Sequence, residues 1–381
     1  MRSPVASTPV RVWIALHALV VLAPVLAMLV PLPDVPLYGV EESSRPRWAF
    51  GAWRAETFQS ALRDWFESHI GFRGVMVRTD STVCAVLGSD KQRQTVLVGS
   101  DDATLYVRDS LLFMAIQRRE LPSFVASAES FAVHLGSVRR KLHDRGRELV
   151  VVVAPNKTML YDENVPARYR GRERVDLQVH EALRAALERA GVPFADANAL
   201  FESQRADVDR LFPRTARHWS RLGACLVLRE ALPVNLARPD CSYDVVPISR
   251  EMSPDFDLYR LQNQWRVETG PVLNTVIRRS DNLGTDRKRI PRALYVGTSF
   301  MWTFGELMRH DVDNAVALYY NRSFYDVTSN ARDPLPPAEP GSPRWADYAL
   351  GRDLYVIEIL EEYLRDGYVL PFLKTLDEHL E

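Results

Sequence analysis

The stretch ALYVGTSF, residues 293–300, is a short apolar run that ends in Gly-x-Ser. A buried strand takes this form when it presents a serine at its carboxyl end. Residues 301–309 are expected to form the helix that follows, which places Ser299 between a strand and a helix. A serine hydroxyl becomes nucleophilic when a base such as histidine takes its proton. The stretch therefore predicts one strand of a sheet and a candidate nucleophile at its end.

A second apolar run, ELVVVVAPN at residues 148–156, has the β-branched composition of a strand buried on both faces. Further strands are expected at residues 193–196, 316–320 and 353–359, and helices at residues 123–145, 177–190, 219–231 and 361–368. This alternation predicts an α/β fold with a doubly wound, mostly parallel sheet. Ligands bind beyond the carboxyl ends of the strands in such sheets, so Asn156, Ser299 and Asn321 could share one site.

The region ahead of this alternation predicts a helix and a hairpin. Residues 58–70 carry apolar side chains at helical spacing, and that helix would place Trp65 and Phe66 toward a core. A strand pair is expected within residues 94–106, with residues 99–102 as its turn.

The N-terminal residues predict a membrane anchor. Residues 12–30 carry no formal charge and approach the ~20 residues that cross ~30 Å of hydrocarbon. Arg2 and Arg11 precede this run, so the positive-inside rule keeps residues 1–11 in the cytoplasm and puts the body outside. The expected location is the inner membrane, single-pass, with the main domain in the periplasm or another extracytoplasmic space. A cleaved signal peptide and a buried helix are the alternatives.

Composition bounds the function classes. The chain has 381 residues, 46% of them hydrophobic, and a formal net charge of −1. It can bury a sizeable core, and it has no overall positive charge that would attract nucleic acid. Its three cysteines form no CxxC or Cys/His cluster, so no metal site is expected. A disulfide between Cys225 and Cys241 is possible and would leave Cys84 as a thiol.

His218 is the candidate base for Ser299. It lies in the stretch TARHWS, residues 215–220, and no acid precedes it where an Asp-x-His pattern would place one, because Ala216 occupies that position. The Ser-His pair suggests acyl-transfer chemistry.

Several blocks of the chain carry a family resemblance. They are residues 58–62 leading into 65–73, the hairpin at 98–106, the Pro-Asn-Lys strand end within 153–161, His218-Trp219-Ser220, and Gly297-Thr298-Ser299-Phe300. In this order they resemble the SGNH hydrolase-like polysaccharide O-acetyltransferases of the alginate acetylation (AlgJ/AlgX) type. The resemblance implies an SGNH-like, flavodoxin-like sheet at residues 48–381, after a linker at 31–47. The motif order is circularly permuted, because the histidine precedes the serine.

The resemblance also implies roles for single residues. Ser299 would be the nucleophile, His218 its base, and the backbone N–H of Ser299 part of the oxyanion hole. Asn156 and Asn321 are candidates for oxyanion or substrate contacts, although a strand-end cap is the simpler role for either. Asp207 or Asp209 could reach His218 from the preceding loop. No cofactor is expected.

Other side chains are candidates for binding a polysaccharide acceptor. Guanidinium groups at Arg287, Arg289 and Arg292 could hold the carboxylates of a uronic-acid polymer, and Trp219 and Trp302 could stack on sugar rings. A solvated loop and a packed core are the respective alternatives.

Three functions are consistent with these residues. The first is an O-acetyltransferase that acetylates an alginate-like extracellular polysaccharide and receives acetyl groups from a membrane-bound O-acyltransferase. The second is a catalytically degenerate scaffold or polysaccharide-binding partner of such an acyltransferase, because Ala216 stands where the triad acid is expected. The third is an extracytoplasmic acetylesterase.

Overall fold

The computed structural model describes residues 8–28, 34–40, 42–87, 95–171, 175–246, 254–265, 272–274, 289–328, 332–365 and 368–380. The chain divides into two compact units. One comprises Met1–Gln94 with Arg260–Val267, and the other comprises Thr95–Tyr259 with Glu268–Glu381.

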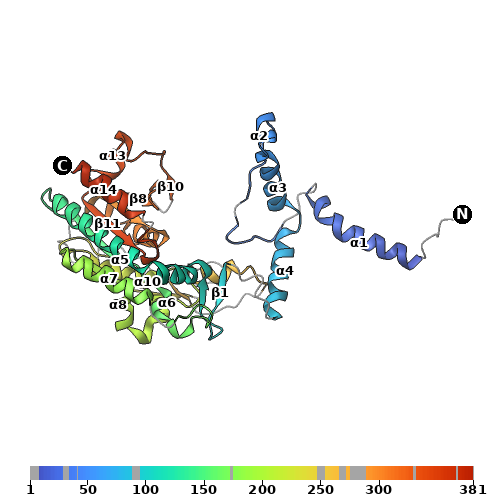
Figure 1. Cartoon of the computed structure of the whole chain (residues 1–381), viewed down its shortest axis with the longest axis horizontal. Helices are drawn as coiled ribbons and strands as arrows, with labels where there is room; N and C mark the ends of the chain where they lie inside the picture. The colour runs from blue at the N-terminus through green and yellow to red at the C-terminus, as the bar shows by residue number, and fades with distance from the viewer. Residues whose placement is uncertain are drawn as a thin grey trace. The chain divides into compact units, whose positions relative to one another are not determined.

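A seven-stranded sheet organises the larger unit, with the order β10-β9-β8-β7-β11-β3-β4. Figure 1 labels its strands β8, β10 and β11. Five neighbouring strands are parallel, and β9 and β10 add an antiparallel edge. The strands are β3 (Glu148–Val153), β4 (Phe194–Asp196), β7 (Ile290–Gly297), β8 (Val312–Tyr319), β9 (Ser323–Asp326), β10 (Asp333–Pro334) and β11 (Leu354–Ile359). The expected mostly parallel α/β sheet is confirmed.

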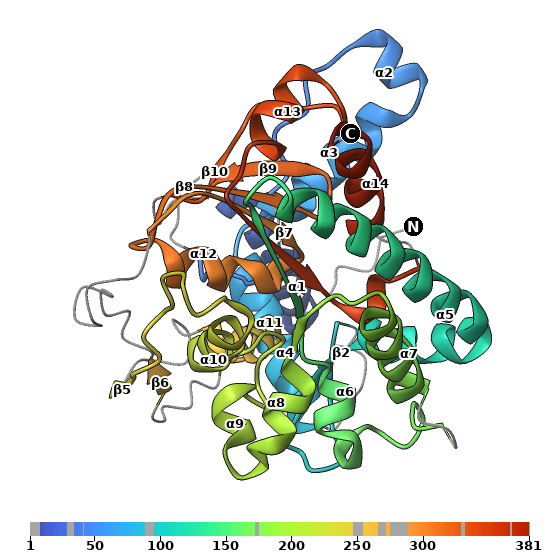
Figure 2. The same ribbon diagram turned by 90° about the vertical axis from the view of Figure 1, so that its left-hand side faces the viewer.

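Helices cover both faces of this sheet, as a doubly wound fold requires (Figure 2). One face carries α5 (Arg108–His143), α7 (Val175–Arg189), α13 (Pro343–Ala349) and α14 (Val369–His379). The other carries α6 (Lys157–Leu160), α8 (Ala197–Ser203), α9 (Val208–Leu211), α10 (Arg221–Ala231) and α12 (Trp302–Met308). The central strands alternate between the two cores: in β3, Val150 and Val152 face one and Val151 and Val153 the other.

The expected hairpin is present as β1 (Val96–Val98) and β2 (Leu105–Val107), which pair antiparallel. Asp101 closes its turn, because its carboxylate accepts hydrogen bonds from the backbone N–H groups of Ala103 and Thr104 at 3.2 and 2.9 Å. A second small pair joins β5 (Asp244–Val246) and β6 (Val272–Asn274), and α11 (Asp257–Leu261) follows β5 in the chain.

Two helix predictions are wrong in extent. α5 begins 15 residues before the expected start at residue 123, and it continues through Pro122 with a kink at Glu120. The helix expected at residues 361–368 is replaced by a short 3₁₀ turn, Glu361–Tyr363, and α14 begins only at Val369. Glu361 and Glu362 are buried and contact His180 and Arg217, and these polar contacts hold the segment in place of a helix.

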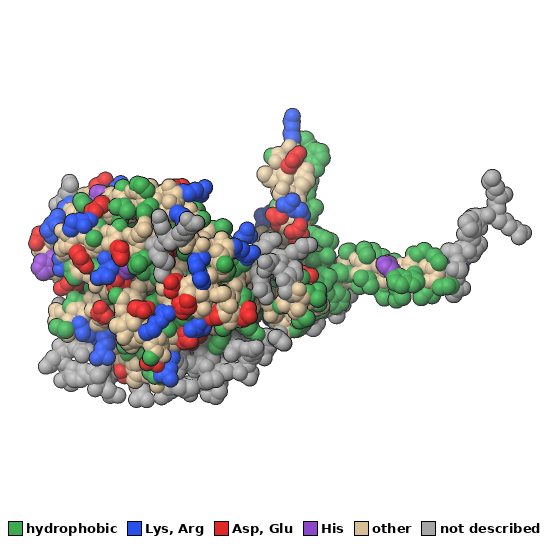
Figure 3. Space-filling model, turned by 60° about the horizontal axis from the view of Figure 1, so that its bottom comes forward, with side chains coloured by type: hydrophobic (Ala, Val, Ile, Leu, Met, Phe, Trp, Pro, Cys, Tyr) green, Lys and Arg blue, Asp and Glu red, His purple; other side chains and the backbone are tan. Residues whose placement is uncertain are grey.

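The smaller unit contains α1 (Thr8–Ala27), α2 (Phe50–Arg54), α3 (Thr57–His69) and α4 (Arg73–Val86). α1 is the one helix among the described residues that is long and apolar enough to cross a membrane, and hydrophobic side chains cover most of it (Figure 3). α3 matches the helix expected at residues 58–70, but it buries no residue. The expectation that Phe66 points into a core is wrong, because its exposed fraction is 39%.

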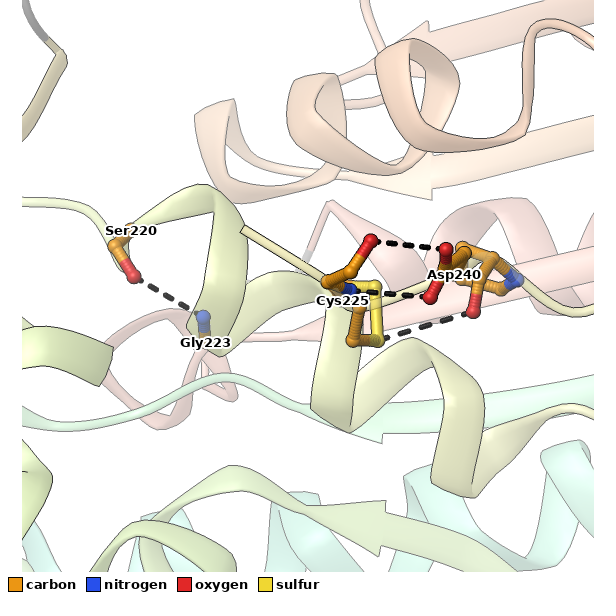
Figure 4. Close-up of a disulfide and its surroundings, with 7 residues drawn as sticks. Ser220, Gly223, Cys225 and Asp240 are labelled. Atoms are coloured by element: carbon orange, nitrogen blue, oxygen red, sulfur yellow. Dashed lines mark hydrogen bonds between the residues drawn. A yellow bond between two sulfur atoms is a disulfide. The ribbon is translucent and has the colours of Figure 1, made fainter. Parts of the chain in front are cut away.

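A disulfide joins Cys225 on α10 to Cys241, 16 residues further along the chain (Figure 4). Ser220 caps this helix, because its hydroxyl accepts a hydrogen bond from the backbone N–H of Gly223 at 3.1 Å. The bond therefore ties the segment after α10 to a helix whose first turn directly follows His218.

Because this disulfide closes a loop of 16 residues, the loop-entropy relation predicts that it stabilises the protein by about 3 kcal/mol. Replacing both Cys225 and Cys241 by serine should lower the free energy of unfolding by that amount in urea titrations followed by circular dichroism. The matched control is Cys84→Ser, because Cys84 is the free cysteine. An equal effect of the two replacements would contradict the prediction.

Candidate active site

Ser299 lies just after the carboxyl end of β7 and is the first residue of a short 3₁₀ turn, Ser299–Met301. Thr298 begins that turn, and its hydroxyl accepts a hydrogen bond from the N–H of Phe300 at 3.3 Å. Gly297 is required beside it, because a Cβ at this position would lie 2.4 Å from Oε2 of Glu358. The strand end and the turn together fix the position of the serine hydroxyl.

His218 reaches Ser299 from the loop before α10. Its Nε2 lies 2.6 Å from Oγ of Ser299, although 81 residues separate the two in the chain. The ring of Phe300 packs against the imidazole edge-on, with centroids 4.9 Å apart. The expected Ser-His pair is therefore assembled in the structure.

A third residue completes the arrangement. Oδ2 of Asp257, at the start of α11, lies 2.6 Å from Nδ1 of His218, and Oδ1 accepts the backbone N–H of Arg217 at 2.7 Å. Burial by itself raises the pKa of Asp257, but the hydrogen bond and charge of His218, the Arg217 N–H and the charge of Lys157 lower it below its usual 3.8. The carboxylate is therefore ionised at neutral pH. It can hold the proton on Nδ1 and leave Nε2 free to accept the proton of Ser299.

Asp257 corrects the expectation about the orienting acid. Asp209 lies elsewhere, because its carboxylate accepts hydrogen bonds from Tyr161 at 2.8 Å and from Arg214 at 3.0 Å. Asp207 pairs with Arg210 at 3.1 Å. Ala216 is fully buried, so a carboxylate at that position would have to enter the core. No sequence motif marks Asp257, which lies 39 residues after the histidine.

The two asparagines have different surroundings. Asn156 is buried and caps α6: its side-chain oxygen accepts the N–H of Thr158 at 3.0 Å, and its amide donates to Glu361 at 3.3 Å. Asn321 lies in the turn between β8 and β9 with a left-handed φ of 53°. Asn156 therefore has the capping role considered for it, whereas Asn321 is a turn residue.

The expected sugar-binding side chains do not gather at the triad. Trp219 is 2% exposed and belongs to the core, whereas Trp302 is half-buried against Tyr319 and Tyr325. Arg289 and Arg292 pair with Asp313 and Asp353 near the amino end of β7. At about 3.3 Å per residue, this is more than about 20 Å along the strand from Ser299. Arg287 lies outside the described residues.

A small pocket of about 30 Å³ adjoins the triad. Phe300, Arg217 and Leu258 line it, and each is the direct neighbour in sequence of a triad residue. Asn156 and Phe212 also line it. No group of three or more potential metal ligands occurs in the part of the chain that the structure describes.

Glu358 holds Thr298, the residue that precedes the nucleophile. Glu358 was not identified in the sequence analysis. This buried carboxylate on β11 accepts hydrogen bonds through Oε2 from the backbone N–H of Thr298 and from its hydroxyl at 2.9 Å. Its other oxygen, Oε1, is buried and has no hydrogen-bond partner among the described residues. Burial raises the pKa of Glu358 to about 7, and the two bonds from Thr298 only partly oppose that shift.

Comparison with known proteins gives one family match. Residues 107–234 match the family model described as "SGNH hydrolase-like domain, acetyltransferase AlgX". The resemblance inferred from the motifs is thereby confirmed, and the matched region includes His218 but ends before Asp257 and Ser299. No curated protein matches the chain.

Three solved structures are similar at low identity. The O-acetyltransferase domain of Pseudomonas putida AlgJ is 19% identical, with a TM-score of 0.45, over 74% of this chain and 99% of that one. Pseudomonas aeruginosa AlgX is 18% identical, with a TM-score of 0.38, over 65% of this chain and 61% of that one. Bacillus cereus PatB1 is 9% identical, with a TM-score of 0.39, over 63% and 91%.

The raised pKa of Glu358 predicts how stability depends on pH. The folded state holds this proton more tightly than the unfolded chain, whose ordinary value is 4.5. Stability from this group is therefore present below pH 4.5 and decreases as the pH rises to about 7, by about 3 kcal/mol in total.

Glu358→Gln removes the titration while keeping an oxygen for Thr298. The free energy of unfolding of the parent should decrease relative to that of this variant as the pH rises from about 4.5 to 7. Urea titrations of both proteins at several pH values measure it. A difference that stays constant over that range would show that Glu358 titrates normally.

Proposed function

We propose that this protein is an extracytoplasmic O-acetyltransferase that carries acetyl groups on Ser299 and transfers them to polysaccharide hydroxyl groups. The observation that carries the proposal is the continuous contact of Asp257, His218 and Ser299, with 2.6 Å at each junction. The acetyltransferase family match over residues 107–234 supports the same reaction class.

In the first half-reaction, Nε2 of His218 takes the proton of Ser299 while Oγ attacks the acetyl carbonyl carbon. The backbone N–H of Ser299 is the nearest candidate to stabilise the oxyanion of the tetrahedral intermediate. The donor's leaving oxygen then takes the proton from His218, and acetyl-Ser299 remains. Asp257 stabilises the imidazolium that exists between these proton transfers.

In the second half-reaction, a sugar hydroxyl takes the place of the departed donor. Its proton passes to Nε2 of His218 as its oxygen attacks the acetyl carbon. The Ser299 oxygen leaves and recovers the proton, so the enzyme returns to its starting state and one ester bond has replaced another. Water in place of the sugar would make the protein an acetylesterase.

The proposed setting follows from α1. This helix would anchor the protein to the inner membrane with the larger unit in the periplasm, where polysaccharide acceptors are exported. A membrane-bound O-acyltransferase would supply the acetyl group, and an alginate-like polymer would accept it. The non-catalytic scaffold is less well supported, because Asp257 supplies the acid that Ala216 lacks.

Acetyl-enzyme formation tests the triad. Ser299→Ala should abolish acetylation of the protein by p-nitrophenyl acetate, measured by intact mass, and His218→Ala should slow it severely. Asp257→Asn should lower the acylation rate by up to about 10⁴-fold, because His218 then loses the tautomer it needs. Asp209→Asn is the matched control, since Asp209 contacts Arg214 and Tyr161, and should leave the rate within about threefold. A folded parent no faster than Ser299→Ala would favour the scaffold.

The fate of the acetyl group separates transferase from esterase. Acetyl-enzyme prepared with a labelled acetyl group should lose its label faster when uronic-acid oligosaccharides are added, and the label should appear on the sugar. Label that appears only as free acetate, at a rate independent of the oligosaccharide, would support the esterase instead. Neutral oligosaccharides in a parallel reaction show whether carboxylates on the acceptor matter.

A further inference from the structure

The apolar face of α3 is only partly covered by the described residues of its own unit. Phe58, Leu62, Phe66 and Ile70 follow each other at intervals of four residues, so they form one stripe along the helix. None of them is buried, and Leu62 and Phe66 are 42% and 39% exposed. The opposite face is polar and solvated, with Ser60 exposed and the side chain of Asp64 about half exposed. An amphipathic helix whose apolar side is open requires an occupant from outside the unit.

Contacts between α1 and the turn after α3 indicate what that occupant is. The backbone N–H of Gly71 donates a hydrogen bond of 3.0 Å to the carbonyl of Pro24, inside the last turn of α1. The packing there is close, because a Cβ on Gly71 would lie 2.3 Å from Cβ of Ala27. Pro24 lies three residues before the end of α1, so the turn contacts α1 about 5 Å inside its outer end.

A second contact fixes α4 to the chain that leaves α1. The carboxylate of Asp34 accepts the backbone N–H of Gly74 at 3.0 Å, and a Cβ on Gly74 would lie 1.9 Å from the carbonyl oxygen of Val35. The first turn of α4 exposes Phe72 and Met76, at 39% and 41%. In Figure 1, α1 runs crosswise to both α3 and α4. If α1 crosses the bilayer, it would therefore hold α3 and α4 along the surface of the bilayer.

We propose that α3 and the start of α4 lie in the outer membrane–water interface, with the stripe Phe58–Leu62–Phe66–Ile70 and Phe72 inserted among the lipids. The occupant of the open apolar face is therefore the bilayer at the boundary between headgroups and acyl chains. An interfacial helix buries its apolar face about 5–10 Å deep, which agrees with a turn about 5 Å inside the end of α1. The proposal rests on the proposed anchor, but it does not require that the protein acetylates anything.

Depth-dependent quenching tests this placement in the full-length protein. Single cysteines are introduced into a Cys84→Ser background, where Cys225 and Cys241 are bonded to each other and do not react. Each is labelled with an environment-sensitive fluorophore, and the protein is reconstituted in phosphatidylcholine vesicles. The vesicles carry nitroxides either at the headgroup or in the middle of the acyl chain. The stripe is probed by Leu62→Cys and Phe66→Cys, the opposite face of α3 by Ser60→Cys and Asp64→Cys, and α1 by Val20→Cys.

The expected result is a difference between neighbouring residues of one helix. Headgroup nitroxides should quench labels at positions 62 and 66 by about twofold or more, and labels at positions 60 and 64 hardly at all. Mid-chain nitroxides should quench the label at position 20. Equal quenching at all four α3 positions would overturn the interfacial placement even if position 20 is quenched. An unquenched label at position 20 would overturn the anchor and the placement together, and would leave the acetyl-transfer proposal intact.

Discussion

The half-buried side chain of Lys157 makes the contacts on which the geometry of the site depends. Its Nζ donates hydrogen bonds to the carbonyls of Leu105, Pro213 and Arg214 at 3.2, 3.0 and 2.9 Å, and also to that of Ala216. These carbonyls belong to β2 and to the loop that ends at His218. The carbonyls of Pro213 and Arg214 also accept the backbone N–H groups of Ala216 and Leu105, so the ammonium is a further donor that links β2 to this loop. Burial lowers the pKa of Lys157 to about 7, although the nearby Asp257 favours the charged form. The triad acid thus also helps to keep charged the group that holds the loop of its own histidine.

Behind Lys157, a second polar network holds the end of β3. Glu361 contacts both His180 and the amide of Asn156, and His180 contacts Asp196 at 3.0 Å through its other ring nitrogen. Burial lowers the pKa of His180, but the two carboxylates outweigh it and raise the pKa to about 10. A charged imidazolium between two carboxylates is therefore part of the fold at neutral pH. With Glu358 under Thr298, buried polar groups support both the strand end of Asn156 and that of Ser299.

Local patterns made most of the fold predictable, and distance along the chain decided what was not. The strands around Val150 and Val296 were evident because strands buried on both faces need unbroken apolar runs. Ser299 and His218 were found because each lies in a short motif. Asp257 was not, because a carboxylate 39 residues away has no fixed spacing to its histidine, and triads are defined by geometry rather than by order. The stripe on α3 was recognised, but the period of a helix does not say whether its apolar side meets protein or lipid.

The disulfide has a consequence for how the triad comes together. His218 and Asp257 lie on opposite sides of the loop that Cys225 and Cys241 close. In the unfolded chain the bond offers a shortcut that reduces the covalent path between base and acid from 39 residues to about 24. The entropic free-energy cost of bringing the two residues together falls by only about 0.4 kcal/mol, because this cost varies with the logarithm of path length. The entropic cost of forming the contact between His218 and Asp257 is thus slightly lower in an oxidising compartment, where the disulfide forms, than in a reducing one. Redox conditions during folding therefore affect the assembly of the catalytic contact as well as the stability of the finished protein.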